Sequence, residues 1–176
     1  MAGTLTYPEV ISDFNAYDDG DRLQGISGEV TLPTLSAITT AISGGGVLGE
    51  YNTAIPGVFQ AMQQEIPFRM IGKEYFAMSI ANQQMNLTLR SSIQSVNRET
   101  GGTISSQGMR VVLRGRPTAY NFGTLSQGNL MNASITLEIT YIMIEIGGEN
   151  LFELDKLNSI FKVLGKDLLE DIRNQC

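Results

Sequence analysis

The chain has 176 residues, of which 42% are hydrophobic and 17% charged, and its formal net charge is −6. This composition is typical of a globular protein, and the length predicts one domain spanning residues 1–176. Histidine is absent and Cys176 is the single cysteine. These absences exclude a Ser-His-Asp triad, a histidine-liganded metal centre, a disulfide within the chain and a cysteine-based zinc site.

The sign of the charge changes along the chain. Residues 1–50 carry a net charge of −6, residues 51–117 a net charge of +4, and residues 118–176 a net charge of −4. No block contains a basic run typical of nucleic-acid binding, and the positive block is rich in Gln, Ser and Thr. We therefore expect acidic and basic surfaces to face each other between copies of the chain, and we give nucleic-acid binding less weight.

The N-terminal sequence lacks the basic start and the apolar run of a signal peptide. No window approaches the ~18 apolar residues that a membrane span needs. We expect the protein to be made and assembled in a cytoplasm.

Glycine-rich turns divide the first third of the chain. Residues 18–20 predict a turn, and residues 44–46 predict the turn of a hairpin between a run at 32–43 and a run at 47–68. Both runs alternate weakly and their residues are small, so neither face is expected to form a thick core. Such strands suit a sheet that a neighbour covers or the wall of a wet channel. An ordinary solvated edge hairpin is the alternative.

The middle of the chain predicts a short helix and then a long β-hairpin. Apolar residues have helical spacing at 73–82. Residues 84–94 alternate between an apolar face and an entirely polar face, which is typical of a half-buried strand. A turn at 100–102 joins this strand to a second one, whose apolar residues oppose three arginines. The apolar residues are Met85, Leu87, Leu89 and Ile93 in the first strand and Met109, Val111 and Leu113 in the second.

The last third predicts a further strand and a closing helix. The run at 133–146 changes parity near Tyr141, which predicts a bulge or a change of packing partner, and residues 147–148 predict a turn. Residues 166–174 place Leu168, Leu169 and Ile172 on one stripe, with acidic residues early and Arg173 late, as a helix dipole favours. We predict a mainly β fold: a sandwich or barrel with two long hairpins and one or two short helices.

Two acidic groups resemble functional motifs, and each has a plainer explanation. Asp18, Asp19 and Asp21 lack the alternating ligands and the distant Glu of a calcium loop, so a solvated turn is expected. Glu153 and Asp155 share a strand face, but nothing indicates the burial that a catalytic acid pair needs.

Residues 44–49 have the glycines of a phosphate loop without its Lys-Ser/Thr, and they open no helix, which favours a flexible turn. Three arginines have one nearby aromatic residue, Tyr120, instead of the stacked series that binds single strands, which favours ion pairs between subunits. We expect no catalytic residue, no metal site and no cofactor. What remains is a structural protein that associates with itself, because exposed sheet edges must be paired or closed.

Several segments resemble, in order and spacing, one family of structural proteins. They are FNAYDDG (14–20), GISGEVTLP (25–33), GGG (44–46), RVVLRGR (110–116), ITLEITY (135–141), LFELDKLN (151–158) and VLGKDLL (163–169). Together they resemble the FII-type major tail tube proteins of contractile-tailed phages and phage-tail-like bacteriocins, and the resemblance spans residues 15–173.

This resemblance implies a tail-tube domain that forms hexameric rings, in which each subunit gives two hairpins to a continuous inner β-barrel. Stacked rings would form a tube that a contracting sheath drives through a cell envelope, conducting DNA in a phage or ions in a headless particle. The implied partners are other copies of the chain, the sheath protein, and the baseplate tube-initiator, tape-measure and tail-terminator proteins, with transient DNA passage in a phage. The implied location is a virion tail or phage-tail-like particle assembled in the bacterial host cytoplasm.

Candidate residues follow from combining the resemblance with the alternation. The predicted lumen-facing residues are Gln84, Asn86, Thr88, Arg90, Ser92 and Gln94. The predicted contacts between subunits or rings are Asp18, Asp19, Asp21, Gly44, Gly45, Gly46, Arg110, Arg114 and Arg116. Two alternatives stay open: a type VI secretion-like tube or baseplate tube-initiator ring, and a monomeric β-barrel that binds a ligand in its interior. The 7% aromatic content and the absence of Trp count against the second.

Overall fold

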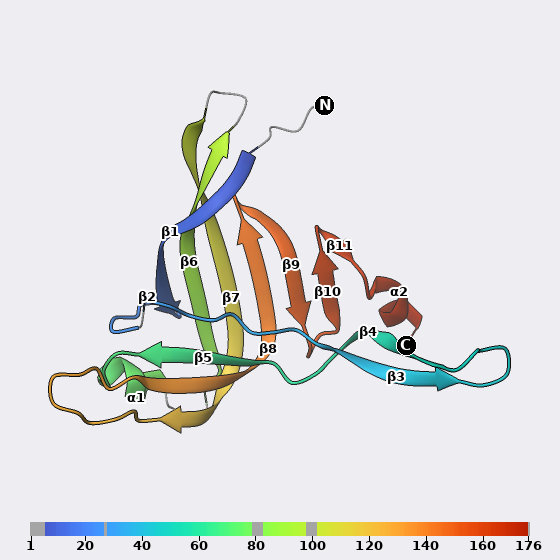
Figure 1. Ribbon diagram of the computed structural model, residues 1–176, viewed down its shortest axis with the longest axis horizontal. Helices are drawn as coiled ribbons and strands as arrows, with labels where there is room; N and C mark the ends of the chain where they lie inside the picture. Colours follow the sequence, from blue (N-terminus) through green and yellow to red (C-terminus); the bar gives the residue numbers. More distant parts are fainter. Residues whose placement is uncertain (1–5, 27, 79–82, 98–101, 176) are drawn as a thin grey trace.

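The computed structural model describes residues 6–26, 28–78, 83–97 and 102–175, and it is built mainly of antiparallel strands with two short helices (Figure 1). The main sheet has the strand order β11-β10-β9-β8-β7-β6-β1-β2, and β5 pairs with β8 beside this path. β3 and β4 form a separate two-stranded sheet. The prediction of a mainly β protein is confirmed, and both sheets are open. The elements are β1 (Thr6–Asp18), β2 (Asp21–Arg22), β3 (Ala37–Ser43), β4 (Glu50–Phe59), β5 (Gln63–Phe68), α1 (Lys73–Met78), β6 (Met85–Asn97), β7 (Thr103–Asn121), β8 (Ala133–Ile146), β9 (Glu149–Asp155), β10 (Ile160–Val163), β11 (Lys166–Asp167) and α2 (Glu170–Gln175).

The long hairpin predicted from the alternation is β6 and β7. The two strands pair in unbroken register from Met85 opposite Gly115 to Asn97 opposite Thr103. Leu87 and Leu113, which are opposite each other, are both completely buried. The predicted turn lies partly in residues 98–101, outside the described residues. The alternation therefore predicted both the pairing and the buried face.

A bulge in β8 explains the change of parity near Tyr141. Arg114 is opposite Tyr141, but the next residue, Gly115, is opposite Ile139, so Thr140 is the extra residue. Before the bulge the odd-numbered residues of β8 are buried, and after it Ile142 is buried instead. The predicted bulge is confirmed, and it bends β7 and β8 as they leave the upright part of the sheet (Figure 1).

The predicted long strand at 47–68 is wrong as a single element. It divides into β4, which pairs with β3, and β5, which pairs with β8. Gly57 has a φ of +74°, and the chain leaves the hairpin after Phe59. The division occurs because Ile66 and Phe68 are buried in the core against β8, whereas the hairpin extends away from it.

The first predicted helix is found as α1, which covers Lys73–Met78, and residues 79–82 of that prediction lie outside the described residues. The second predicted helix is shorter than expected: Lys166–Asp167 is the strand β11, and α2 begins only at Glu170. The Asp167 carboxylate accepts a hydrogen bond from the backbone N–H of Leu169 (3.0 Å), which favours a turn before the helix. Of the predicted apolar stripe only Leu169 is buried.

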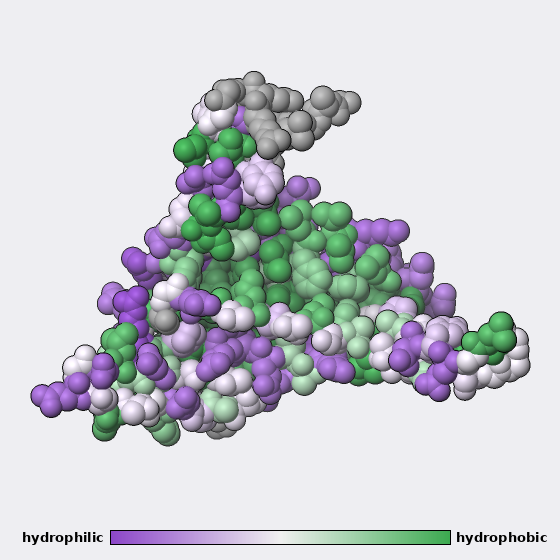
Figure 2. Space-filling view, in the orientation of Figure 1, coloured by the Kyte–Doolittle hydropathy of each residue, from purple (hydrophilic) through white to green (hydrophobic). Residues whose placement is uncertain are grey.

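The core lies between one face of the main sheet and a layer formed by β5, α1 and the segment 23–35. Its centre is Tyr75, which is completely buried. The Tyr75 hydroxyl shares its one proton between the backbone carbonyls of Asn121 (3.1 Å) and Ser134 (3.3 Å), and this three-centre hydrogen bond joins β7 and β8 to α1. The covering layer stops short of the upper half of the sheet, and Figure 2 shows a broad hydrophobic surface there.

Candidate functional site

The first candidate surface is the polar face of the main sheet. In the β6–β7 register Asn86 is opposite Arg114, and Arg90 is opposite Arg110. Residues directly opposite in an antiparallel pair point to the same side. The arginines predicted as subunit contacts therefore share a face with the predicted lumen residues. Of those residues, Gln84 is exposed just before β6, and Asn86, Thr88, Arg90, Ser92 and Gln94 follow on this face of the strand.

Arg90 and Arg110, which lie opposite each other on the polar face, both have partners within the chain. The Arg90 guanidinium carbon lies 5.1 Å from the centre of the Tyr17 ring on β1. Arg110 forms an ion pair and hydrogen bond with Glu145, its register partner on β8. Cation–π and ion-pair contacts of this kind turn the two positive charges away from each other.

A second cluster centres on Tyr141. The Arg114 guanidinium carbon lies 4.4 Å from the centre of the Tyr141 ring, and the Tyr141 hydroxyl donates a hydrogen bond to Glu153 (3.0 Å). Lys162 forms an ion pair with the same carboxylate (3.7 Å). Burial, with a smaller effect of Glu153, raises the pKa of Tyr141 to about 12. From the sequence, Glu153 was considered as one member of a catalytic acid pair. In the structure its carboxylate contacts Tyr141 and Lys162.

Asp155, its companion, binds the following turn. The Asp155 carboxylate accepts hydrogen bonds from the backbone N–H groups of Leu157 and Asn158, both at 3.0 Å. Its role is to hold the connection between β9 and β10. Among the residues that the structure describes, no group of three or more Cys, Asp or Glu is placed to hold a metal ion, and no helix is long and apolar enough to cross a membrane.

The acidic turn at Asp18, Asp19 and Asp21 connects β1 to β2. Asp19 adopts a φ of +49°, and its carboxylate accepts a hydrogen bond from the Asn86 side chain (3.2 Å). Burial raises the pKa of Asp18, and the neighbouring carboxylates act in the same direction. This acidic turn therefore lies against the first residues of β6, at one end of the polar face. The remaining arginine, Arg116, is exposed opposite Glu138.

The second candidate surface is the β3–β4 hairpin, which we call the arm (Figure 1). It extends from the body, and its turn contains Gly44, Gly45 and Gly46, where an added Cβ would meet no other atom within 4 Å. Ile42 is opposite Tyr51, and both are exposed. An isolated two-stranded hairpin is marginally stable in water, so an arm of this kind is expected to need a partner.

The arm has two chemically different faces. Even-numbered β3 residues and odd-numbered β4 residues make an apolar face, whereas the opposite face is small and polar. The sequence reading missed this apolar face, because threonines and alanines interrupt it. The register of the hairpin was the signal that would have found it. The apolar face carries Ile38, Ile42, Tyr51 and Ile55, and the small polar face carries Thr39, Ala41, Ser43, Asn52 and Ala54, together with the charged Glu50 opposite Ser43.

Aromatic and aliphatic contacts fix the base of the arm. The rings of Phe59 and Phe161 meet edge to face with centroids 5.2 Å apart. Gly57 lies so close to Leu169 that any side chain at position 57 would overlap it. These contacts join the arm to β10 and to the turn before α2, so they set the direction in which it leaves the body.

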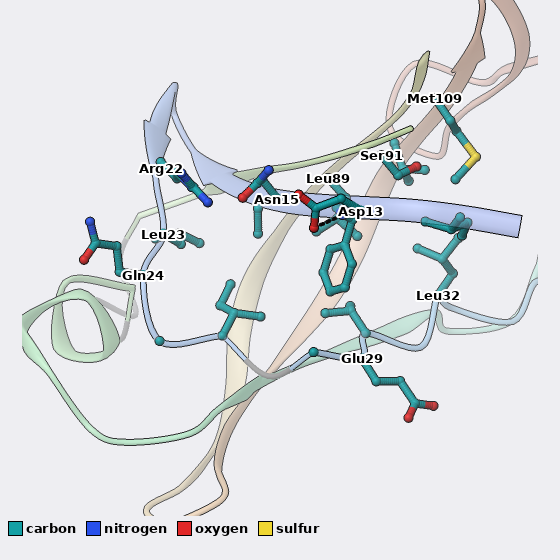
Figure 3. Close-up of a pocket in the computed structure, with 18 of the residues that line it drawn as sticks. Asp13, Asn15, Arg22, Leu23, Gln24, Glu29, Leu32, Leu89, Ser91 and Met109 are labelled. Atoms are coloured by element: carbon teal, nitrogen blue, oxygen red, sulfur yellow. Dashed lines mark hydrogen bonds between the residues drawn. The ribbon is translucent and has the colours of Figure 1, made fainter. Parts of the chain in front are cut away.

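A groove of about 810 Å³ lies between the apolar face of β1, β6 and β7 and the segment 22–32. Figure 3 shows Asn15, Leu89 and Ser91 along one wall and Leu32 across from Met109. Its walls mix apolar and polar residues, and Phe14 is its one aromatic lining residue among those described. This groove is an incompletely covered part of the core face and lacks the aromatic lining that the ligand-binding alternative needs.

The fold and these surfaces define a class of protein: a β-structured subunit whose exposed strands and polar face suit assembly with copies of itself. Comparison with known proteins identifies the class. The family model "Phage tail tube protein FII" matches residues 8–176, and the chain belongs to this family.

Two curated relatives agree with that assignment, and one solved structure has a similar fold. The chain is 28% identical over 174 residues to the tail tube protein of Escherichia phage P2, covering 96% of this chain and 97% of that protein. It is 29% identical over 167 residues to the major tail tube protein of Serratia phage KSP20, covering 95% and 94%. Its fold is similar to that in a cryo-EM structure of an extracellular contractile injection system described as a PVC sheath/tube terminator in the extended state. That match has a TM-score of 0.53 and 12% identity, and it covers 79% of this chain and 97% of the other.

Proposed function

We propose that this chain is the structural subunit of the inner tube of a contractile phage tail or phage-tail-like particle. The observation that carries the proposal is the surface area. The chain exposes 11582 Å², whereas a compact monomer of 19.2 kDa exposes about 8,400 Å². The excess of about 3,100 Å² falls within the range that obligate interfaces between subunits bury.

The subunits form hexameric rings, and the rings stack into a hollow tube. The polar face of the main sheet lines the bore, with Asn86, Thr88, Ser92 and Gln94 as the lining side chains. The internal partners of Arg90, Arg110 and Arg114 support this placement, because a dense track of unpaired cations would bind DNA strongly and slow its passage.

Further contacts and partners complete the proposal. The acidic turn at 18–21 and the arm turn at 44–46 contribute contacts between subunits or rings, and Arg110, Arg114 and Arg116 contribute where they reach a neighbour. The tube binds the sheath, baseplate tube-initiator, tape-measure and tail-terminator proteins. It resides in the virion tail or particle after assembly in the host cytoplasm, and it has no enzymatic activity.

Native mass spectrometry of the purified protein tests the ring directly. Six chains of 19.2 kDa give a species of about 115 kDa, or larger species in multiples of that mass. A Thr88→Cys variant in a Cys176→Ser background tests the bore: its single thiol should react with a small maleimide in assembled tubes and be protected from a maleimide-bearing protein too large to enter. A monomer at every concentration, or equal labelling by both reagents, would contradict the proposal.

A further inference from the structure

We propose that copies join head to tail, with the β3–β4 arm of one copy adding to the free edge of β1 in the next. The arm then continues the main sheet of its neighbour. This inference rests on the proposed self-assembly of the tube subunit and names the surfaces that meet.

The acceptor is the outer edge of β1. On one side β1 pairs with β6 from Thr6 to Asp18, whereas on the other side β2 pairs only with Tyr17 and Asp18. Within the described part of the chain no strand covers the outer edge at 6–15. A long free edge is a ready template for another strand. Irregularities between Pro8 and Asp13 add the twist and curvature that a sheet needs to close around an axis.

The opposite edge of the main sheet is protected. Its last strand, β11, has two residues, and β10 has four. Lysines at 162 and 166 and the helix α2 lie at this end. Short strands, lysines and covering helices are the usual devices that prevent pairing at an edge. The β1 end of the strand order is therefore long and open, whereas the β11 end is short and covered.

The donor of the added strands, the arm, lies near the β10–β11 end of the main sheet. The contact between Phe59 and Phe161 ties the arm to β10, at the far end of the sheet order from β1 and β2. A fixed donor at one end and an acceptor at the other cannot meet within one copy. They form a heterologous contact, which generates a ring when the rotation closes and a helical filament when it does not.

The faces of the two surfaces match in this arrangement. On β1, Asn15 is opposite Arg90 and shares its polar face, whereas Phe14 is opposite Ser91 and lies on the apolar face. When the arm extends this sheet, its small polar face continues the polar face. Its apolar face, including Ile42 and Tyr51, joins the core face beside the groove. A shift by one residue would reverse both faces, so this matching restricts the pairing to registers that differ by an even number of residues.

Charge and area also favour a second copy as the occupant. The arm, residues 37–59, carries a single charged residue, Glu50, so its burial removes little charge from water. Four of its large apolar side chains, those of Ile38, Ile42, Tyr51 and Ile55, are between 37% and 53% exposed. The excess exposed area of about 3,100 Å² is what an obligate contact between copies needs.

Disulfide trapping in assembled protein tests this pairing. In a Cys176→Ser background, Thr39→Cys, Ala41→Cys or Ser43→Cys is combined with Asp13→Cys or Asn15→Cys, which gives six pairs. Each arm cysteine is also combined with Lys166→Cys at the β11 edge as the matched control. After mild oxidation we expect at least one β1 pair to give a reducible ladder of covalent multimers on a denaturing gel, and the Lys166 controls to give none. A ladder from the controls, or no ladder from all six β1 pairs while tubes are visible by electron microscopy, overturns the pairing and leaves the tube function standing.

A second pair of variants tests the face. Ile42→Lys places a charge on the apolar face, and Ser43→Lys places one on the adjacent position of the polar face. Both should unfold at the temperature of the wild type, because position 42 and position 43 are exposed in the single chain. We expect Ile42→Lys to raise the concentration for half-assembly by at least about tenfold and Ser43→Lys to change it little. Equal effects would overturn the assignment of faces. Failure of the wild type itself to assemble would overturn the proposed function and the pairing together.

Discussion

Arg90 of β6 lies directly opposite Arg110 of β7, in the middle of the polar face. Like charges in this position destabilise a strand pair. Each side chain instead meets a partner on its outer side: Arg90 the ring of Tyr17, and Arg110 the carboxylate of Glu145. The hairpin thus depends on β1 and β8 for electrostatic balance as well as for hydrogen bonds.

Replacing Glu145 should expose that dependence. In Glu145→Gln the charge of Arg110 loses its partner and faces Arg90. The side chains of Arg110 and Glu145 are 42% and 24% exposed, so we expect a loss of about 0.5–1 kcal/mol in the free energy of unfolding, decreasing with added salt. Urea denaturation at two salt concentrations measures it, with Glu149→Gln, an exposed change in the neighbouring strand, as the control. A double-mutant cycle with Arg110→Gln that shows no coupling would contradict the account.

Two glycines of β7 should respond differently to alanine. A Cβ on Gly115 would overlap the carbonyl oxygen of Glu138 in β8, whereas a Cβ on Gly108 would meet nothing within 4 Å. We expect Gly115→Ala to cost about 2–4 kcal/mol and Gly108→Ala to change stability by less than about 0.5 kcal/mol. Denaturant unfolding of the two variants compares them. Similar values would show that the close approach at the bulge does not constrain the fold.

Alkaline pH should destabilise the protein through Tyr141. Burial raises the pKa of Tyr141 to about 12, above the ordinary value of 10.0. Between these two pH values the Tyr141 hydroxyl therefore keeps its proton in the folded state and loses it in the unfolded state. Stability that is present below pH 10 is therefore lost as the pH rises towards 12. Unfolding free energies between pH 9 and 11 should fall more steeply in the wild type than in Tyr141→Phe, which keeps the buried Tyr75 as a common background. Parallel curves would show that Tyr141 titrates normally.

Removing the aromatic anchor should loosen the arm. Phe161→Ala deletes the edge-to-face contact with Phe59, so we expect faster amide hydrogen exchange in β3 and β4 and a loss of about 1–3 kcal/mol in global stability. Hydrogen exchange measured by mass spectrometry follows the arm peptides, with Phe122→Ala, whose ring is 58% exposed, as the control. Unchanged protection in the arm would mean that its direction is set elsewhere.

Regular alternation was the part of the fold that sequence reasoning could recover. The β6–β7 hairpin follows from an unbroken period of two, and the bulge near Tyr141 follows from a single break in such a period; both patterns depend only on neighbouring residues. The strand β1 was missed because irregularities at Pro8–Val10 and at Ile11–Asp13 shift its parity twice within 13 residues. The predicted run at 47–68 was not divided into β4 and β5, because the partner of β5, the strand β8, lies about 70 residues further along the chain.

The candidate site could be predicted only in part, for a related reason. Alternation placed Asn86, Thr88 and Arg90 on one face, but which side chains lie beside them depends on the pairing with β1, β7 and β8. The partners Tyr17 and Glu145 therefore required the structure. The amphipathic character of the arm likewise depends on the register that puts Ile42 opposite Tyr51.

The central claim is that this chain builds a hollow tube by head-to-tail joining of its copies. Electron microscopy of the purified protein across a range of concentrations tests this claim most directly. The account predicts rings with an open centre that stack into straight tubes at high concentration. Monomeric particles at every concentration, still without rings when a sheath or baseplate tube-initiator protein is added, would contradict it.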